Sequence, residues 1–362
     1  MGFGDLFKWV VVRFQVVAML TCGITALHVP DVEATESSSE LQDQLVYHIQ
    51  RIKKELKPLN LSHVPSLSAS EKIYLAYYGI YFDDIKHYMG TFTSGPYRLS
   101  AHVLMPHDAK ATIFLLHGYL DHTGILKNLI HLCVQQQLAV AMYDLPGHGL
   151  SDGDSCSIND FYDYVSVFKD FIEKYRAFLP NPHHFVGHST GSAIAFDYMH
   201  RVAGKNFDKL IYIAPLVRSA YWTISKANHY LAKPFIDSVP RGFFDNTSNP
   251  QFNEFIREDP LQCADIPLKW VEALFAWNER VEAYKPISHP VLIIQGREDT
   301  VVDWQYNIPF QKRKNDLITV KWFGNGRHHL LNESEALREE VLKTIGNYLQ
   351  LSGTEFNLPE SN

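Results

Sequence analysis

A serine framed by two glycines is the first feature of this sequence that could do chemistry. Ser189 is the central residue of the segment 187–191 (Gly-His-Ser-Thr-Gly) and follows the apolar residues Phe185 and Val186. Glycines two positions on either side let the backbone turn sharply from a strand into a helix, which presents the serine hydroxyl at the edge of a sheet. We therefore predict that Ser189 is a nucleophile, exposed at this corner, and that the N–H of Thr190 helps to bind an oxyanion.

A serine nucleophile needs a base and a carboxylate that orients the base. The apolar run Val291–Gln295 predicts a buried strand, and Asp299 lies in the loop just after it. We predict Asp299 as the carboxylate. Glu298 and Asp303 compete for this role, but we expect Glu298 to turn away from the site and Asp303 to cap the next helix.

Two neighbouring histidines compete for the role of the base. His328 and His329 follow the last predicted strand, Ile318–Phe323. The chain has eighteen histidines, and a histidine in a loop usually has no chemical role. The order serine, aspartate, histidine is typical of hydrolases with this serine corner, and His328 completes it.

A second oxyanion donor is predicted after another buried strand. The run Ala111–Leu116 ends in His117, Gly118 and Tyr119, and the N–H of Tyr119 is our candidate for this donor. A further strand, Ala139–Asp144, leads into a segment rich in turn residues at the same sheet edge. We expect the loop residues His122 and His148 to make structural hydrogen bonds.

Several of these segments resemble the α/β-hydrolases, and among them the serine hydrolases grouped as lysophospholipases and monoacylglycerol lipases. The resemblance covers roughly residues 85–350, and the segments that carry it are 117–124, 144–151, 187–191, 259–261, 296–302 and 327–333. It implies an α/β-hydrolase fold, with a mostly parallel central sheet, helices on both faces and a helical cap insertion. In the last segment, the register makes His328 the base and places His329 where the family has an acidic residue.

The chain departs from the family at three positions near the serine. Thr190 stands where Met or Gln is common, Ser192 replaces a second glycine, and Tyr119 is bulkier than the usual residue. None of these changes removes a group that the chemistry needs.

Composition limits the remaining classes of function. With 362 residues, 46% of them hydrophobic and 20% charged, the chain can form one large α/β domain. Its net charge of −7 without clustered Lys and Arg argues against nucleic-acid binding. Four widely spaced cysteines without a CxxC pair (Cys22, Cys133, Cys156 and Cys263) argue against a zinc site and are compatible with one disulfide.

The N-terminus predicts an export signal or a membrane anchor over residues 1–28. Lys8 and Arg13 precede the apolar run 14–27, and Ile24–Ala26 offers a cleavage site of small residues. The expected product is periplasmic or secreted, or else anchored in a membrane; the third alternative is an amphipathic helix that packs on the domain.

Residues 29–44 are predicted to be a linker, 45–352 the hydrolase domain and 353–362 a tail. Apolar residues at helical spacing between Leu41 and Leu56 predict a helix docked on the domain.

Residues 217–286 form an insertion too long for one crossover between strands, which predicts a cap. The insertion is rich in aromatic residues (Tyr221, Trp222, Tyr230, Phe235, Phe243, Phe244, Phe252, Phe255, Trp270, Phe275 and Trp277). We expect most of them to pack in the cap's own core and some to cover the serine. An apolar cover suits a substrate with an acyl chain and a small head group.

The predicted function is hydrolysis of a lysophospholipid or monoacylglycerol ester through an acyl-enzyme, with no metal and no organic cofactor. The N-terminus and the cap are the candidates for membrane association. One alternative is a serine aminopeptidase, whose cap would hold the substrate amine with carboxylates such as Glu254, Glu258, Asp259 and Glu272. The other alternative is a non-catalytic binding protein on the same fold.

Overall fold

A computed structural model describes residues 36–350, except residues 64 and 203–205, and only the backbone of residues 36–41. The predicted signal or anchor (1–28) and the predicted tail (353–362) lie outside the described residues. The chain divides into two units, residues 1–43 and 44–362, and the description below concerns the second. Within the described part of the chain, no helix has both the length and the apolar character that a membrane span requires.

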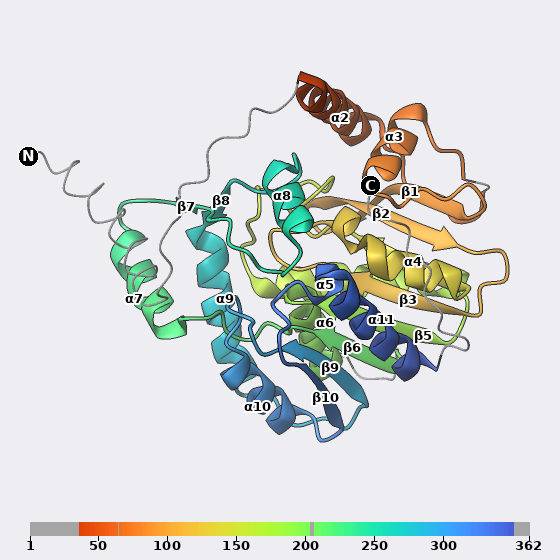
Figure 1. The fold of residues 1–362 in the computed structure, drawn as a ribbon. Coiled ribbons are helices and arrows are strands. Elements are labelled where there is room, and N and C mark those ends of the chain that lie inside the picture. The colour runs from red at the N-terminus through yellow and green to blue at the C-terminus, as the bar shows by residue number, and fades with distance from the viewer. Residues whose placement is uncertain (1–35, 64, 203–205, 351–362) are drawn as a thin grey trace, which may run out of the picture. The chain divides into compact units, whose positions relative to one another are not determined.

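The second unit is built on an eight-stranded sheet (Figure 1) with the order β1-β2-β4-β3-β5-β6-β9-β10. The strands β1 and β2 form an antiparallel hairpin, β2 pairs antiparallel with β4, and the other pairs are parallel. The bounds are β1 (Lys86–Ser94), β2 (Tyr97–Met105), β3 (Ala111–Leu116), β4 (Leu138–Tyr143), β5 (His183–His188), β6 (Lys209–Ile213), β9 (Val291–Gly296) and β10 (Ile318–Phe323). This mostly parallel sheet confirms the predicted α/β-hydrolase fold.

Two hydrophobic cores lie on opposite faces of the sheet, because the side chains of a strand alternate between its faces. On β3, Ile113 and Leu115 join one core, whereas Phe114 and Leu116 join the other. The first core contains apolar residues of α3 (Ala69–Tyr77), α4 (Lys127–Gln135) and α11 (Glu335–Leu349). The second contains those of α5 (Phe161–Tyr175), α6 (Thr190–Arg201) and α10 (Trp304–Lys314).

The predicted N-terminal helix is α2 (Glu36–Glu55), which begins inside the range predicted as a linker. Its residues Leu45, Ile49 and Ile52 are buried in the same core as α3 and α4. Lys53 and Lys54, which directly follow Ile52, are exposed.

The insertion between β6 and β9 contains three helices and a short ribbon. They are α7 (Trp222–Ala232), β7 (Ser238–Pro240), α8 (Pro250–Glu258), β8 (Asp265–Pro267) and α9 (Leu268–Val281), and they lie together at one end of the sheet in Figure 1. The expectation that most of the insertion's aromatic residues form its own core is only partly met. Four are buried (Trp222, Trp270, Phe275 and Trp277), but five are exposed (Tyr221, Tyr230, Phe235, Phe243 and Phe244).

One disulfide joins the cap to the rest of the unit. Cys156, in the loop between β4 and α5, is bonded to Cys263, just before β8. Cys133 is free and lies in the core, where burial raises the pKa of its thiol to about 12. Cys22 lies outside the described residues.

Candidate functional site

Ser189 lies at a sharp corner between β5 and α6, as predicted. Its backbone has φ 50° and ψ −110°, a conformation that is costly for a residue with a side chain. A Cβ atom on Gly191 would lie 2.5 Å from the carbonyl oxygen of Leu116, and one on Gly187 would lie 2.7 Å from the carbonyl carbon of Gly191. The two glycines therefore permit the helix to approach the sheet at this corner.

The expectation of an exposed serine needs correction. Ser189 is only 5% exposed, because neighbouring segments close over the corner. Its N–H donates to the oxygen of Ile213 (2.8 Å), and its own carbonyl accepts from the N–H of Leu216 (3.2 Å). Little of this residue is therefore in contact with solvent.

Asp299 and His328 lie together at the ends of β9 and β10. The Nδ1 of His328 is 2.9 Å from Oδ2 of Asp299. The carboxylate also accepts hydrogen bonds from Gln295 Nε2 (3.0 Å) and from the N–H groups of Val301 (2.9 Å) and Val302 (3.1 Å). This set of donors holds the carboxylate in place and in its charged form.

The electrostatics of this pair leave the other ring nitrogen of His328 available. Burial alone would raise the pKa of Asp299, but the charge and hydrogen bond of His328, with the two backbone N–H groups, bring it below its usual value. An ionised Asp299 can only accept, so Nδ1 of His328 carries the proton that lies between them. In the neutral ring, Nε2 then has the free lone pair that a base requires.

The two competing carboxylates have other contacts. Asp303 caps α10, accepting a hydrogen bond from the N–H of Tyr306 at 3.1 Å, as predicted. Glu298 is half exposed and lies 3.9 Å from Nε of Arg327. Of the three carboxylates, Asp299 is the one that forms a hydrogen bond with His328.

His188 connects the serine corner to the histidine loop. Its Nε2 lies 3.1 Å from the carbonyl oxygen of His328 and donates to it, and the two rings are 4.8 Å apart between centroids. His188 directly precedes Ser189 in the chain. The fold therefore brings the three predicted residues Ser189, Asp299 and His328 to one edge of the sheet.

The two predicted oxyanion donors flank the serine. Thr190 is the first residue of α6, so its N–H has no partner within the helix. Gly118 packs against the serine, since a Cβ atom there would lie 3.2 Å from Cβ of Ser189. The backbone of Tyr119 follows directly, which puts both predicted donors next to the nucleophile.

The bulky side chain of Tyr119 is held by the cap. Its hydroxyl donates to the carbonyl oxygen of Cys156 (2.8 Å), and its ring stacks on Trp270 of α9 with a centroid distance of 3.5 Å. One side chain thus joins the loop after β3, the disulfide and the cap. The sequence did not predict this contact.

His122 makes structural hydrogen bonds, as predicted, in a buried network whose other members were not predicted. Asp259, at the end of α8, accepts hydrogen bonds from Nε2 of His122 (2.7 Å) and from the hydroxyl of Tyr78 (2.7 Å). Burial alone would lower the pKa of His122, but Asp259 raises it overall, and His122 in turn lowers the pKa of Asp259. In the sequence, Asp259 belongs to a segment that resembles the family and is a candidate amine-binding carboxylate, but neither observation predicts its contact with His122.

This network also bears on the aminopeptidase alternative. Asp259 accepts hydrogen bonds from His122 and Tyr78. Glu272 forms an ion pair with Lys233. Glu254 and Glu258 are exposed. The four carboxylates therefore do not form the amine-binding cluster that this alternative requires.

Three buried residues beside the serine have the donor types of a metal site. The candidate ligand atoms of Asp121, His188 and His329 all lie within 4.8 Å of one another. His148 is not part of this group, since its Nδ1 lies 2.8 Å from the carbonyl oxygen of Pro146, a structural contact as predicted. Hydrolysis by a serine nucleophile and a histidine base requires no metal ion at this cluster.

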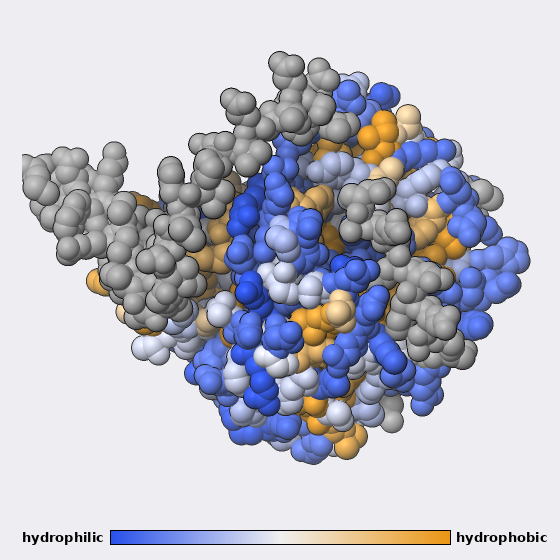
Figure 2. Space-filling model, viewed as in Figure 1, coloured by the Kyte–Doolittle hydropathy of each residue, from blue (hydrophilic) through white to orange (hydrophobic). Residues whose placement is uncertain are grey.

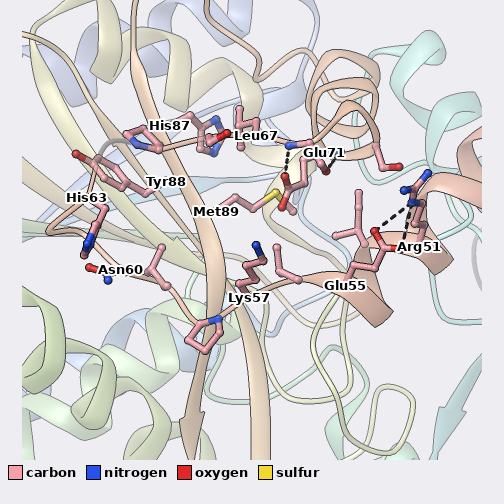
Figure 3. A pocket seen from close by; sticks show the side chains of 18 residues that line it. Arg51, Glu55, Lys57, Asn60, His63, Leu67, Glu71, His87, Tyr88 and Met89 are labelled. Atoms are coloured by element: carbon pink, nitrogen blue, oxygen red, sulfur yellow. Dashed lines mark hydrogen bonds and ion pairs between the residues drawn. The ribbon is translucent and has the colours of Figure 1, made fainter.

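Two hollows lie away from the serine. One, of about 360 Å³, is bordered by α2, α3, β1 and the chain between the two helices (Figure 3), with side chains such as Arg51, His63 and His87 around it. The other, of about 480 Å³, lies between residues 154–157 and the cap. None of the five predicted site residues lines either hollow.

The order of the strands, the corner at Ser189 and the Asp299–His328 pair define an α/β-hydrolase. A profile of the family described as "Serine aminopeptidase, S33" matches residues 107–335. The chain belongs to this family, and its matched region contains all five predicted site residues.

Several proteins with a similar sequence are named as lipases, and one is named as a phospholipase. The monoglyceride lipase of Mus musculus is 27% identical over 254 residues, which cover 66% of this chain and 82% of the relative. The phospholipase YtpA of Bacillus subtilis is 25% identical over 257 residues, or 64% of this chain and 92% of the relative.

Solved structures share the fold. The monoacylglycerol lipase of Paleococcus ferrophilus superposes with a TM-score of 0.59 at 20% identity, covering 69% of this chain and 98% of that protein. A soluble variant of the monoglyceride lipase of Saccharomyces cerevisiae, in complex with a substrate analogue, gives a TM-score of 0.61 at 19% identity, covering 72% and 94%.

Proposed function

We propose that this protein is a serine hydrolase that cleaves carboxylic esters of lipids with a single acyl chain, such as monoacylglycerols or lysophospholipids. The observation that carries the proposal is the Asp299–His328 hydrogen bond of 2.9 Å beside the strained corner at Ser189. The relatives named as monoglyceride lipases and as a phospholipase support the choice of a lipid ester.

In the proposed mechanism, Nε2 of His328 takes the proton of Ser189 while the serine oxygen attacks the ester carbonyl. The N–H groups of Tyr119 and Thr190 stabilise the oxyanion of the tetrahedral intermediate. His328 then gives its proton to the departing alcohol, which leaves the acyl group on the serine. Water, activated by the same histidine, releases the fatty acid.

Asp299 supports this cycle without itself exchanging the proton. Its carboxylate holds His328 in the tautomer with Nδ1–H and stabilises the imidazolium formed during each attack. Because the pKa of Asp299 lies below its usual value, the carboxylate is ionised at neutral pH. Its three other hydrogen bonds fix the direction from which it meets the ring.

The test is hydrolysis of four substrates by the wild type and by Ser189→Ala: a monoacylglycerol, a lysophospholipid, a short-chain ester and an aminoacyl amide. We expect the lipid esters to be the best substrates and the variant to lose their turnover. Preference for the amide would instead favour the aminopeptidase alternative. Equal inactivity of two folded proteins on all four substrates would favour the binding-protein alternative.

We also propose that the protein works in an oxidising compartment, either exported or anchored by residues 1–28. The charged and apolar pattern of that segment supports this. The Cys156–Cys263 disulfide supports it as well, because such bonds form and persist outside the reducing cytosol. Fractionation of cells that express the full chain tests the proposal, which predicts recovery outside the cytosolic fraction.

Membrane association through the cap is the last part of the proposal. The cap carries exposed apolar side chains, namely Ile224, Tyr230 and Leu231 on α7 and Phe244 between β7 and α8, each at least 58% exposed. The face shown in Figure 2 is mostly hydrophilic with scattered hydrophobic residues. Replacing Ile224 and Leu231 by serine should reduce co-sedimentation with phospholipid vesicles, and unchanged binding would contradict a role for this part of the cap.

A further inference from the structure

Arg241 lies where the cap meets the oxyanion loop. It directly follows β7, and its N–H donates to the carbonyl oxygen of Ala264 at 2.8 Å. Its Nη1 donates to Oε1 of Gln262 (2.6 Å) and lies 3.5 Å from the carbonyl oxygen of Leu120. Contacts at the backbone and at the end of the side chain therefore fix the guanidinium beside this loop.

The hydrogen bonding of this guanidinium is incomplete. Arginine has five N–H donors, and both side-chain contacts of Arg241 use Nη1. Among the residues that the structure describes, none accepts from its Nε or Nη2, and no carboxylate lies within ion-pairing distance of it. Two other cap arginines differ, because Arg257 pairs with Asp245 and Arg280 with Asp160.

The nearby carboxylates do not neutralise Arg241 by contact. Burial lowers its pKa, although Asp121 and Asp259 act in the opposite direction from a distance. Asp259 is already bonded to His122 and Tyr78. Since a guanidinium stays charged at neutral pH, the cap holds a partly buried cation whose Nε and Nη2 donate to none of the described residues.

The position of this cation relative to Ser189 follows from the loop. Gly118 packs against Cβ of the serine, and Leu120, whose carbonyl oxygen Arg241 approaches, is two residues further along. Two residues span at most about 7 Å of chain. The phosphorus of a lysophospholipid is separated from its ester carbon by little more than a glycerol unit, which is a comparable length.

The chemistry of the free donors indicates the kind of ligand. A planar guanidinium with unused N–H groups matches the oxygens of a phosphate, to which it can donate two parallel hydrogen bonds. The ring of Phe243 lies over the guanidinium at 4.7 Å and limits its rotation. A neutral glycerol hydroxyl would leave the charge without a partner.

We propose that Arg241 binds the phosphate of a lysophospholipid whose ester lies at Ser189, so that the enzyme prefers phosphate-bearing lipids with one acyl chain to monoacylglycerols. This inference rests on the proposed function and specifies its substrate class. Arg241 is a binding residue in this account and takes no part in proton transfer.

The test compares a monoacylglycerol with the monoacylglycerol phosphate of the same acyl chain, in the same neutral detergent. We measure kcat and KM of the full-length wild type and of Arg241→Gln, with Arg257→Gln as the control for a cap arginine that already has a carboxylate partner. Arg241→Gln should lower the ratio of the two kcat/KM values, phosphate over neutral, by about 10- to 100-fold, which is the range for a lost charged hydrogen bond. The loss should fall mainly on KM, and Arg257→Gln should leave the ratio unchanged.

Arg241→Lys is a second variant, which tests the role of Arg241 even if the glutamine variant folds poorly. It keeps the charge but not the forked geometry, so it should restore part of the ratio. Inhibition of the wild type by glycerol phosphate gives a second measurement, and it should exceed inhibition by glycerol.

The outcomes separate this inference from the proposed function. A wild type that hydrolyses the monoacylglycerol but shows neither preference for the phosphate lipid nor inhibition by glycerol phosphate overturns the role of Arg241. A fall of both kcat/KM values by the same factor in Arg241→Gln does the same, since it indicates a structural role. A wild type that cleaves neither lipid, like Ser189→Ala, overturns the proposed function itself.

Discussion

Removing the disulfide between Cys156 and Cys263 should destabilise the protein strongly. The bond closes a loop with a sequence separation of 107 residues. The chain-entropy relation for a loop of that length gives about 4.8 kcal/mol at 25 °C. With an unfolding entropy of about 2.1 cal/mol/K per residue, this corresponds to a fall in Tm of roughly 6 °C for the full chain.

The assay is thermal unfolding of the wild type and of the double variant Cys156→Ser/Cys263→Ser, each with and without a dithiol reductant. The reductant should lower the Tm of the wild type to that of the double variant and should leave the variant unchanged. Peptide mapping without reduction should find the two cysteine-containing peptides linked in the wild type. This mapping establishes that the bond is present before the Tm values are compared.

Activity should fall as well, at temperatures where both proteins are folded. The hydroxyl of Tyr119 donates to the carbonyl oxygen of Cys156, so a looser loop at Cys156 displaces the predicted oxyanion donor. A linked wild type and a double variant with equal Tm values would refute the reasoning from chain entropy. Equal kcat values would refute the connection to the oxyanion loop.

Three further substitutions test other parts of the account. Asp299→Asn should lower kcat by about 10⁴-fold with little change in Tm, because the amide favours the wrong tautomer of the base; a loss below tenfold would contradict the role of Asp299. Asp259→Asn removes the buried pair with His122. In the wild type, this pairing lowers the pKa of the Asp259 carboxyl and raises the pKa of the His122 imidazole. The stabilisation from the pair should therefore be complete between about pH 4 and pH 6.5, and should be lost as the pH falls below or rises above that window. The free energies of unfolding of wild type and variant in urea should differ by about 3–5 kcal/mol inside the window, and a pH-independent difference would contradict the ion pair. Gly191→Ala places a Cβ atom 2.5 Å from a backbone oxygen of β3 and should abolish activity, whereas Gly324→Ala, with no atom within 4 Å of the added carbon, should behave as the wild type.

The strands and the loops that end them could be predicted because the signals are local. The run Ala111–Leu116 is apolar on both faces, which is typical of a buried parallel strand, and it is β3 in the structure. The parallel strands then bring their carboxyl ends to one edge. This arrangement agrees with the prediction of Ser189, Asp299 and His328, which was made from their positions after predicted strands and from their order in the chain.

The contacts between the cap and the oxyanion loop could not be predicted, because they join residues far apart in the sequence. Tyr119 and Trp270, or His122 and Asp259, meet only after the insertion has folded over the sheet. No period or local motif encodes such a pairing. For the same reason, the sequence could not tell which of the cap's aromatic residues face the solvent.

The burial of Ser189 has a similar origin. The corner motif predicts a serine that projects from the sheet, and the backbone has the expected strained conformation. How far the serine is exposed depends on the segments around the corner, whose path the motif does not specify. The sequence therefore predicted the local geometry of the nucleophile correctly, but not how little of the residue is exposed.

The most direct test of the central claim is covalent labelling of the nucleophile. The full-length protein is treated with a fluorophosphonate, which forms a stable adduct with an activated serine, and the modified residue is identified by mass spectrometry. The account predicts stoichiometric modification of Ser189, no modification of Ser189→Ala, and slow labelling of His328→Ala. A folded wild type that is not labelled, or is labelled at a different serine, would contradict it.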